Sequence, residues 1–387
     1  MILRPFTALL CFVFCAHGAS AQLSSQTVNI PQQVVLQGLR SSASYGKFSA
    51  AAFETDGSLV LLYDQHDGVR LLKTDAGATT LLSQSQTGAK GDSGLAMALD
   101  AAGNIYVTGT TTSGSLVGSS GAAFPARYDT TTNSFLAKYD ANLNLQWLTF
   151  LGAGATVASG VATNGSGVYV TGLTYSQVFP VTASAIQQTP SPSYYQNGFV
   201  ESFTSAGALH YATYLNGVNG GTAPAGIAAD AAGNAYVTGE TSASGFPTIA
   251  ALVPRAESTT SGFLCALNAS GSAFVYSTFL PGEGMTSIAL DPWTGGLLLA
   301  GDVDAGGFPL TTVAMPMVDA AYVTVLRMSL DGQTLISSTP LLPGTGALAT
   351  AVSDGSVWVS GSVSVPLFPG STAPDDAAGA QKEGGRE

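Results

Sequence analysis

The chain has 387 residues, of which 9% are charged, and its 24 acidic and 12 basic residues give a formal net charge of −12. This balance makes nucleic acid a poor partner, because polyanions are bound through clustered Lys and Arg. Soluble domains usually carry about 25% charged residues, so Ser, Thr, Gly, Asn and Gln must supply most of the polar surface here.

The first 21 residues have the pattern of a secretory leader. Arg4 is followed by an apolar run over 6–16 and by Ala19-Ser20-Ala21, which predicts cleavage before Gln22. We therefore expect the protein to be exported, to the extracellular space, the cell surface or a periplasm. No later stretch approaches the ~20 continuous apolar residues that span a bilayer, so no transmembrane segment is expected in the mature chain.

Cysteine usage predicts a fold without disulfides. Cys11 and Cys15 leave with the leader, and Cys265 is the remaining thiol. A single thiol cannot form an internal disulfide, so the fold must rest on its core. We expect Cys265 to be a small buried filler in a strand.

The Phe-Pro pair recurs five times, each time after a hydrophobic stretch that ends in Gly. In four units the Phe follows that Gly by seven positions, and in the first an insertion of eight residues within 110–123 widens the gap to fifteen. This spacing indicates an array of roughly 60-residue units. The pairs are Phe124-Pro125, Phe179-Pro180, Phe246-Pro247, Phe308-Pro309 and Phe368-Pro369.

The best-preserved unit, 221–282, is predicted to form four short antiparallel strands. Its apolar residues alternate with period two, and the whole chain contains 47 glycines and 18 prolines, which a helical repeat would not tolerate. Gly and Asn fill the turns at positions that accept positive φ. The predicted strands are 226–229, 235–241, 262–267 and 273–280, with turns at 230–234 and 268–271.

A single four-stranded sheet has two apolar faces, so it must stack on others, and radial stacking gives a β-propeller. The first strand of each unit has the smallest side chains, which suits a crowded central axis. We therefore place these strands innermost. The small residues are Ala96, Ala98, Gly160, Ala162, Gly226, Ala228, Ala229 and Ala289.

Counting the second strands predicts an all-β fold, a single propeller of about six four-stranded blades over 22–370, with seven possible if 41–90 is miscounted. The last unit ends after two strands, and residues 23–40 are expected to complete it and close the ring, which would remove exposed sheet edges. Residues 371–387 are expected to be a disordered tail. The predicted blades are 41–90, 91–153, 154–220, 221–283, 284–345 and 346–370.

The units combine G-x-A-x-D-x-x-G-N-x-Y-V-T-G, a Phe-Pro loop and a final L-x-Y-x-T-Y-L-x-G strand. This combination resembles the bacterial β-propeller repeat called SBBP and, more distantly, NHL-type repeats. The resemblance is good over 91–282, degraded over 284–370 and poor over 41–90. It implies a secreted or surface-associated propeller, and it carries no catalytic residue over to this chain.

The string Gly91-Asp92-Ser93-Gly94 is similar to the one that holds the nucleophile of chymotrypsin-like proteases. It stands, however, where every unit has a Gly-rich link between blades. His66 and His210 are the mature chain's histidines, and His66 is too close in sequence for the chymotrypsin order. His210 is expected to point outward, because Tyr211 takes the core position that Trp147 and Tyr276 take in the neighbouring units. No catalytic residue is predicted.

No cofactor is predicted either. Two scattered histidines and one cysteine match no zinc or copper spacing. The Asp-x-x-Gly-Asn turns offer oxygen ligands, so calcium is an alternative there. A hairpin turn needs the same residues for backbone reasons, and no turn has the dense D-x-D-x-D spacing of a dedicated loop.

Three aromatic residues are the best candidates for ligand contacts. Tyr194 and Tyr195 lie in an expanded loop, 190–197, beside Gln and Asn, and Trp293 replaces a small residue in a turn. Exposed rings beside amides can stack on sugar faces or anchor a protein. The alternative is that they cover neighbouring loops.

These observations favour a secreted, non-catalytic binding or scaffolding module for a polysaccharide or protein surface, with specificity in the loops between second and third strands. One alternative is a secreted lyase or hydrolase with its site at the central funnel, although the small, neutral inner strands argue against it. Another is a purely structural unit of the cell surface. The sequence identifies neither the ligand nor the oligomeric state.

Overall fold

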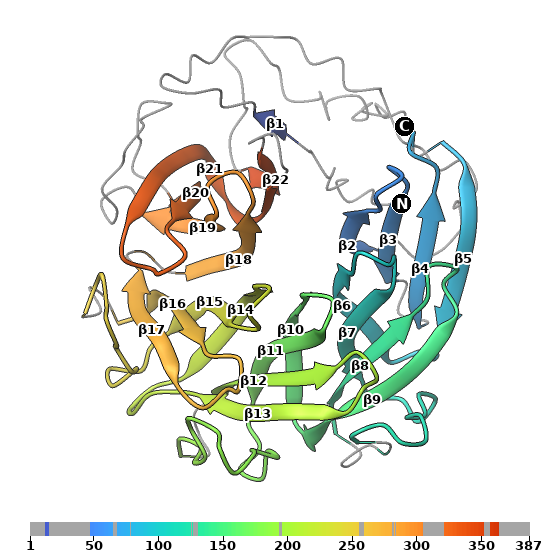
Figure 1. The fold of residues 1–387 in the computed structure, drawn as a ribbon, viewed down its shortest axis with the longest axis horizontal. Coiled ribbons are helices and arrows are strands. Elements are labelled where there is room, and N and C mark those ends of the chain that lie inside the picture. The colour runs from blue at the N-terminus through green and yellow to red at the C-terminus, as the bar shows by residue number, and fades with distance from the viewer. Residues whose placement is uncertain are drawn as a thin grey trace, which may run out of the picture.

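The computed structural model describes residues 12–14, 47–64, 68–77, 79–124, 126, 131–192, 196–254, 259–280, 282, 284–304, 321–351 and 357–363. Within these residues the strands form five antiparallel sheets, which Figure 1 shows arranged around a common axis. The predicted all-β propeller of four-stranded blades is thereby confirmed. In the same residues no helix is long and apolar enough to cross a membrane.

The strands follow one another in chain order from the axis to the rim of each blade. Blade one has β2 (Lys47–Phe53), β3 (Leu59–Asp64), β4 (Val69–Thr74) and β5 (Leu81–Thr87). Blade two has β6 (Asp92–Leu99), β7 (Ile105–Thr111), β8 (Asn133–Tyr139) and β9 (Leu145–Gly154). Blade three has β10 (Thr156–Thr163), β11 (Gly167–Thr174), β12 (Asn197–Thr204) and β13 (Leu209–Leu215). Blade four has β14 (Thr222–Ala229), β15 (Ala235–Thr241), β16 (Ser261–Leu267) and β17 (Phe274–Leu280).

The fifth sheet has six strands, which corrects the predicted number of six or seven blades. It contains β18 (Gly284–Asp291), β19 (Gly296–Asp304), β20 (Ala321–Met328), β21 (Leu335–Ala351), β22 (Val357–Val363) and β1 (Phe12–Phe14). Strand β21 pairs with β20 up to Pro343 and with β22 from Gly344 onward. The expected blade boundary at residue 345 thus lies inside a continuous strand, because glycine also adopts an extended backbone and a Gly-rich stretch need not end a sheet.

The predicted ring closure by residues 23–40 lies outside the described residues, as does the predicted tail, 371–387. The strand that borders β22 is β1, which lies within the residues predicted to be the leader. Closure by the 23–40 segment therefore stays a prediction.

A bulge in each innermost strand explains the Gly that ends the repeated Y-V-T-G sequence. The first strand of every blade shifts register after its second or third residue, as between Gly94 and Ala96 of β6. A Cβ on the Gly opposite would lie less than 3.0 Å from the carbonyl oxygen of the bulged strand. In these four sheets the carbonyl oxygen comes so close that only glycine fits opposite it. The glycines are Gly109, Gly172, Gly239 and Gly301.

Blade one lacks this glycine. Phe48 of β2 is paired with Tyr63 of β3 at the corresponding register position. The sequence signature therefore fails in blade one although the bulge is kept, and this accounts for the poor resemblance over 41–90.

The core lies between adjacent sheets, where small inner strands from neighbouring blades approach one another around the axis (Figure 1). The predicted core aromatics of the outer strands, Trp147, Tyr211 and Tyr276, are buried. Each ring packs against a turn glycine of the next blade, namely Gly207, Gly271 and Gly332. Cys265 is a fully buried free thiol, as predicted, and burial raises its pKa.

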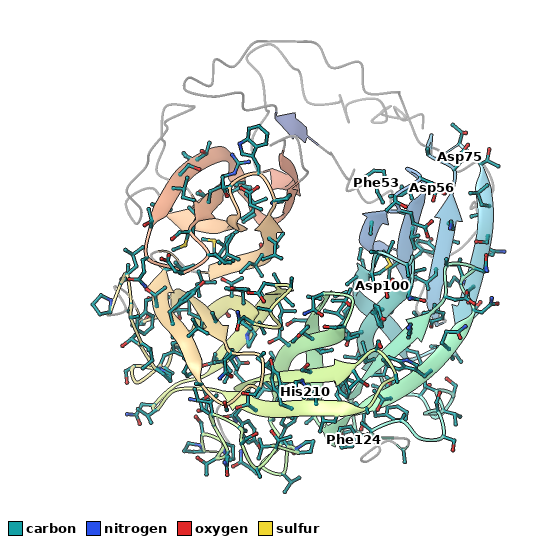
Figure 2. The ribbon with its side chains drawn as sticks, viewed as in Figure 1. Phe53, Asp56, Asp75, Asp100, Phe124 and His210 are labelled. Atoms are coloured by element: carbon teal, nitrogen blue, oxygen red, sulfur yellow. The ribbon has the colours of Figure 1, made fainter. Side chains whose placement is uncertain are left out.

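The Phe-Pro loops fold back over the outermost strands. Phe179 and Phe246 are buried, and the Phe246 ring lies 4.8 Å from that of Phe263 between centroids. Behind Phe246 the chain pairs with β17, since Ile249 and Ser277 exchange both backbone hydrogen bonds. Phe124 lies in the corresponding peripheral loop of blade two (Figure 2). These loops occupy sheet edges that would otherwise be open.

Candidate functional site

The described residues place Trp293 far from the loop between β11 and β12. Trp293 lies in the turn between β18 and β19, and 57% of its side-chain surface is exposed. Tyr194 and Tyr195 lie outside the described residues, but Gln196, which follows them, immediately precedes β12. Turns between first and second strands and loops between second and third strands are at opposite ends of a blade, so Trp293 is on the other face of the propeller from Gln196.

Trp293 is held on a well-anchored turn. The carboxylate of Asp291 is buried, forms an ion pair with Arg327 at 2.9 Å and accepts a hydrogen bond from the Thr294 hydroxyl. The same carboxylate accepts the backbone N–H of Trp293 at 3.1 Å. The turn thus presents its ring to solvent, and none of the hydrogen bonds that the described residues make with this turn comes from a side-chain amide.

On blade three, a network of amides fixes the loop between β11 and β12. The Asn197 side-chain oxygen accepts the Ser191 backbone N–H at 2.7 Å and the Asn216 side-chain amide at 2.9 Å. Gln187 both donates to the Asn216 carbonyl, at 2.9 Å, and accepts its N–H, at 2.8 Å. These buried, charge-free hydrogen bonds hold the loop against β12 and β13 and preorganise its exposed residues.

This loop displays an exposed aromatic residue that sequence reasoning missed. Tyr175 directly follows β11, 49% of its side-chain surface is exposed, and its hydroxyl donates to the Gln196 side-chain oxygen at 3.3 Å. Val178, nearby in sequence, is 59% exposed. We refer to Tyr175, Val178 and Gln196 as the Tyr175 surface. The sequence did contain a signal for this residue. Tyr175 stands three residues after the repeated Gly, where blades two and four have the small polar residues Thr112 and Ser242.

The Asp-containing turns use their carboxylates for their own backbone. Asp100 accepts the N–H groups of Ala102 and Asn104, the Asn104 side-chain amide and the Tyr106 hydroxyl, at 2.8–3.1 Å. Burial alone would raise the pKa of Asp100, but these bonds outweigh it and hold the pKa below its ordinary value. Asp230 repeats the arrangement in blade four with Asn234 and Tyr236.

Calcium at these turns gains no support from the structure. Within the described ranges, no three His, Cys, Asp or Glu side chains gather in a group that could hold a metal ion. The hydrogen bonds of the turns account for their Asp, Gly and Asn residues on structural grounds alone.

The Gly91–Gly94 string has a structural function. Asp92 starts β6, is fully buried, and accepts hydrogen bonds from Thr111, Ser113 and Ser115 and from the Ala89 N–H. Ser113 and Ser115 lie within 110–123, the segment that contains this unit's insertion. Burial would raise the pKa of Asp92, but the donated bonds hold it below its ordinary value.

The described residues bring no histidine to Ser93. His210 is exposed near the start of β13 in blade three (Figure 2), while its neighbour Tyr211 is buried, as the alternation predicts. His66 lies outside the described residues. The structure thus shows no nucleophile and base pair at the string.

The sequence profile of the SBBP β-propeller repeat matches residues 210–247. No curated protein matches the sequence. Solved structures that resemble the fold include Kuenenia stuttgartiensis hydrazine synthase, with 10% identity, a TM-score of 0.45 and coverage of 81% of this chain and 73% of that one. The Neurospora crassa Pan2 WD40 domain has 10% identity, a TM-score of 0.44 and coverage of 84% and 91%.

The Dos1 propeller also has 10% identity, with a TM-score of 0.42 and coverage of 84% of this chain and 81% of that one. With TM-scores below 0.5, these likenesses carry no argument about ligand or activity. The repeat match falls on the last strand of blade three and the first two strands of blade four, where the sequence signature is most regular. The chain is a β-propeller repeat protein that carries the SBBP repeat.

Proposed function

We propose that this protein is a non-catalytic binding module for polysaccharide and that the Tyr175 surface on blade three contacts the ligand. The observation that carries the proposal is an exposed ring hydrogen-bonded to an amide side chain, on a loop that is fixed by a buried network. A rigid loop loses little conformational freedom on binding, which favours affinity.

The chemistry of the Tyr175 surface suits a sugar. The aromatic face can stack on the apolar face of a pyranose, and Val178, three residues further along the same loop, is a second exposed apolar side chain. The Gln196 amide can both donate to and accept from hydroxyl groups. Few charges are needed for this kind of contact, in agreement with the 9% charged residues of the chain.

Export is part of the proposal. It is supported by the leader pattern of residues 1–21 and by a fold that buries its Cys265 thiol and needs no disulfide. N-terminal sequencing of protein recovered outside the producing cell should begin at Gln22. Recovery of the protein with residues 1–21 intact in the cytoplasm would contradict export.

A thermal-shift screen against soluble glycans tests the binding proposal, because a ligand that binds only the folded state raises Tm by mass action. We expect one glycan class to produce a concentration-dependent shift. Tyr175→Ala should weaken the fitted affinity about tenfold or more, equivalent to about 1.4 kcal/mol, while Tyr175→Phe should keep most of it by retaining the ring.

Trp293→Ala is the matched control, since it removes an equally exposed ring at the opposite end of a blade. A shift that Tyr175→Ala leaves intact, or that Trp293→Ala abolishes, would place the ligand elsewhere. If no glycan shifts Tm, the ligand is instead a protein surface or the module is structural.

A further inference from the structure

The outermost strand of blade one differs from those of blades three and four. In β13 and β17 the first two residues are at least partly exposed and the remaining five are buried. In β5 all seven residues are exposed or partly exposed, and Leu81 and Leu82 keep 41% and 55% of their side-chain surface in contact with solvent. Within the part of the chain that the structure describes, β5 is therefore a surface-exposed sheet edge.

Strand β5 is exposed because the loop between the second and third strands of blade one is short. In blades three and four the connection between second and third strands exceeds fifteen residues, and its backbone pairs with the outermost strand, as Tyr214 does with Gln187 and Ser277 does with Ile249. In blade one the connection is residues 65–68. A four-residue connection cannot return across two strands, which are spaced about 4.8 Å apart.

Natural sheet edges usually carry Lys, Pro or another device against pairing with a second chain. Residues 79–89 (TTLLSQSQTGA) contain neither Lys nor Pro and no charged residue at all. In a chain of net charge −12, a charge-free strand is a place where two copies can approach without repulsion between carboxylates.

We propose that β5 is a dimerisation edge and that two copies of this chain pair antiparallel through it, about a two-fold axis at Gln84. Two four-stranded blades then form one eight-stranded sheet across the interface, and the open edge disappears. In this register Ser83 of each copy is opposite Ser85 of the other, Leu81 is opposite Thr87, and the two Gln84 residues are opposite each other. Hydroxyl and amide side chains in such pairs can hydrogen-bond across strands.

The charges at the two ends of the strand support the antiparallel arrangement. Asp75 lies in the turn that precedes β5, at the outer end of blade one (Figure 2), and Lys90, which is exposed, follows the strand. Antiparallel pairing brings Asp75 of one copy toward Lys90 of the other, twice. Parallel pairing would instead place like charges together.

Disulfide trapping tests the register directly. In the full chain carrying Cys11→Ser and Cys15→Ser, Gln84→Cys should form a covalent dimer under mild oxidation, because residues directly opposite in an antiparallel pair have Cα atoms about 4.5–5.5 Å apart. The native Cys265 is buried and should not react. The matched control is Val275→Cys, the second residue of β17, which is 51% exposed on a covered edge and should stay monomeric.

Sedimentation equilibrium of the unmodified chain should show a monomer–dimer equilibrium, and Gln84→Lys should raise its dissociation constant at least tenfold by placing two ammonium groups opposite each other. Val275→Lys should leave the constant unchanged. Circular dichroism confirms that each variant is folded. A monomer at all concentrations, a dimer that Gln84→Lys does not weaken, or open-ended association beyond the dimer would overturn the proposal.

Discussion

Two buried carboxyl groups, Asp92 in blade two and Glu201 in blade three, have opposite surroundings. Asp92, at the start of β6, is surrounded by three hydroxyl donors and a backbone N–H, which together stabilise its negative charge. Glu201, in the middle of β12, is also fully buried, yet neither carboxyl oxygen has a hydrogen-bond partner among the described residues. One carboxyl group is thus kept charged and the other neutral.

The surroundings of Glu201 explain its state. It shares its face of β12 with Phe199 and Phe203, in the core between blades two and three. The titratable residues around this core include Tyr106, Tyr214 and, at its edge, Lys138, whose ammonium group lies 5.4 Å from the centre of the Tyr106 ring. Burial raises the pKa of Glu201 to about 8.

The comparison teaches that burial alone does not decide the charge of a carboxyl group. Asp92 replaces a threonine, since Thr156 and Thr222 occupy its position in blades three and four. Glu201 replaces small side chains, since Ala137 and Cys265 occupy its position in blades two and four. Only the first replacement is accompanied by hydroxyl donors from the loop that follows β7, namely Ser113 and Ser115.

The largest expected effect is the pH dependence that Glu201 contributes. Its pKa rises from about 4.5 in the unfolded chain to about 8 in the folded one, so the folded state binds the extra proton between these values. The stability that comes from this proton on Glu201 is fully present below about pH 4.5 and is lost as the pH rises through about 8. The free energy of unfolding should fall by about 5 kcal/mol across this window.

Glu201→Gln, which cannot ionise, should abolish this loss. Urea denaturation at pH 5, 7 and 9 measures it, and the variant should be the more stable protein at pH 9. Glu240→Gln, at an exposed position, serves as the control and should follow the wild type. Parallel pH profiles for wild type and Glu201→Gln would show that Glu201 is solvated or paired.

Asp92→Ala should have the next largest effect, because it removes the carboxylate that accepts hydrogen bonds from three hydroxyls and a backbone N–H. We expect a loss of about 2–4 kcal/mol at pH 7. The pKa of Asp92 is lowered, so the advantage of the wild type over Asp92→Ala should be largest at neutral pH and should shrink as the pH falls through that pKa, opposite to the trend for Glu201.

The control for Asp92 is Asp92→Thr, which installs the residue found in blades three and four and should lose less stability than Asp92→Ala. Urea denaturation of both variants at pH 7 and at pH 3 measures how much stability each one loses. An Asp92→Ala variant as stable as the wild type at pH 7 would mean that water replaces the carboxylate without cost.

The smallest effect is expected at the Asp turns, where the carboxylate is partly exposed. Tyr236→Phe removes one donor from Asp230, a hydrogen bond of 2.9 Å, and should cost about 1 kcal/mol because water can take its place. Tyr106→Phe repeats the test on Asp100. Unfolding free energies at pH 7 measure both, and losses as large as that of Asp92→Ala would remove the distinction between solvated and buried carboxylates.

Local pattern allowed much of the fold to be predicted. The period-two alternation, the turn glycines and the small inner strands gave the four strands of blades two to four, the burial of Trp147, Tyr211 and Tyr276, and the exposure of His210. The number of blades was wrong, because it depended on whether a Gly-rich stretch breaks a strand or stays within it. In β21 the pairing with β22 decides this, and that pairing is not local.

The candidate site was predicted only in part. The expanded loop of unit three was recognised, but Tyr175 was overlooked because it precedes the loop's conspicuous residues. Trp293 was grouped with Tyr194 and Tyr195 although strand order places its turn on the other face. The exposure of an aromatic side chain, and the face of the propeller on which it lies, depend on how the loops fold back over the blade. Composition does not contain that information.

By itself, the sequence determined the repeat, the strand periodicity and the need for radial stacking, because these follow from side-chain size and alternation within about 60 residues. The tertiary structure alone decided which edges are covered, which carboxyl groups are charged and which rings face solvent. Each of these depends on contacts between segments tens of residues apart. Examples are Ser113 and Ser115 with Asp92, and the loops that cover β13 and β17 but, among the described residues, not β5.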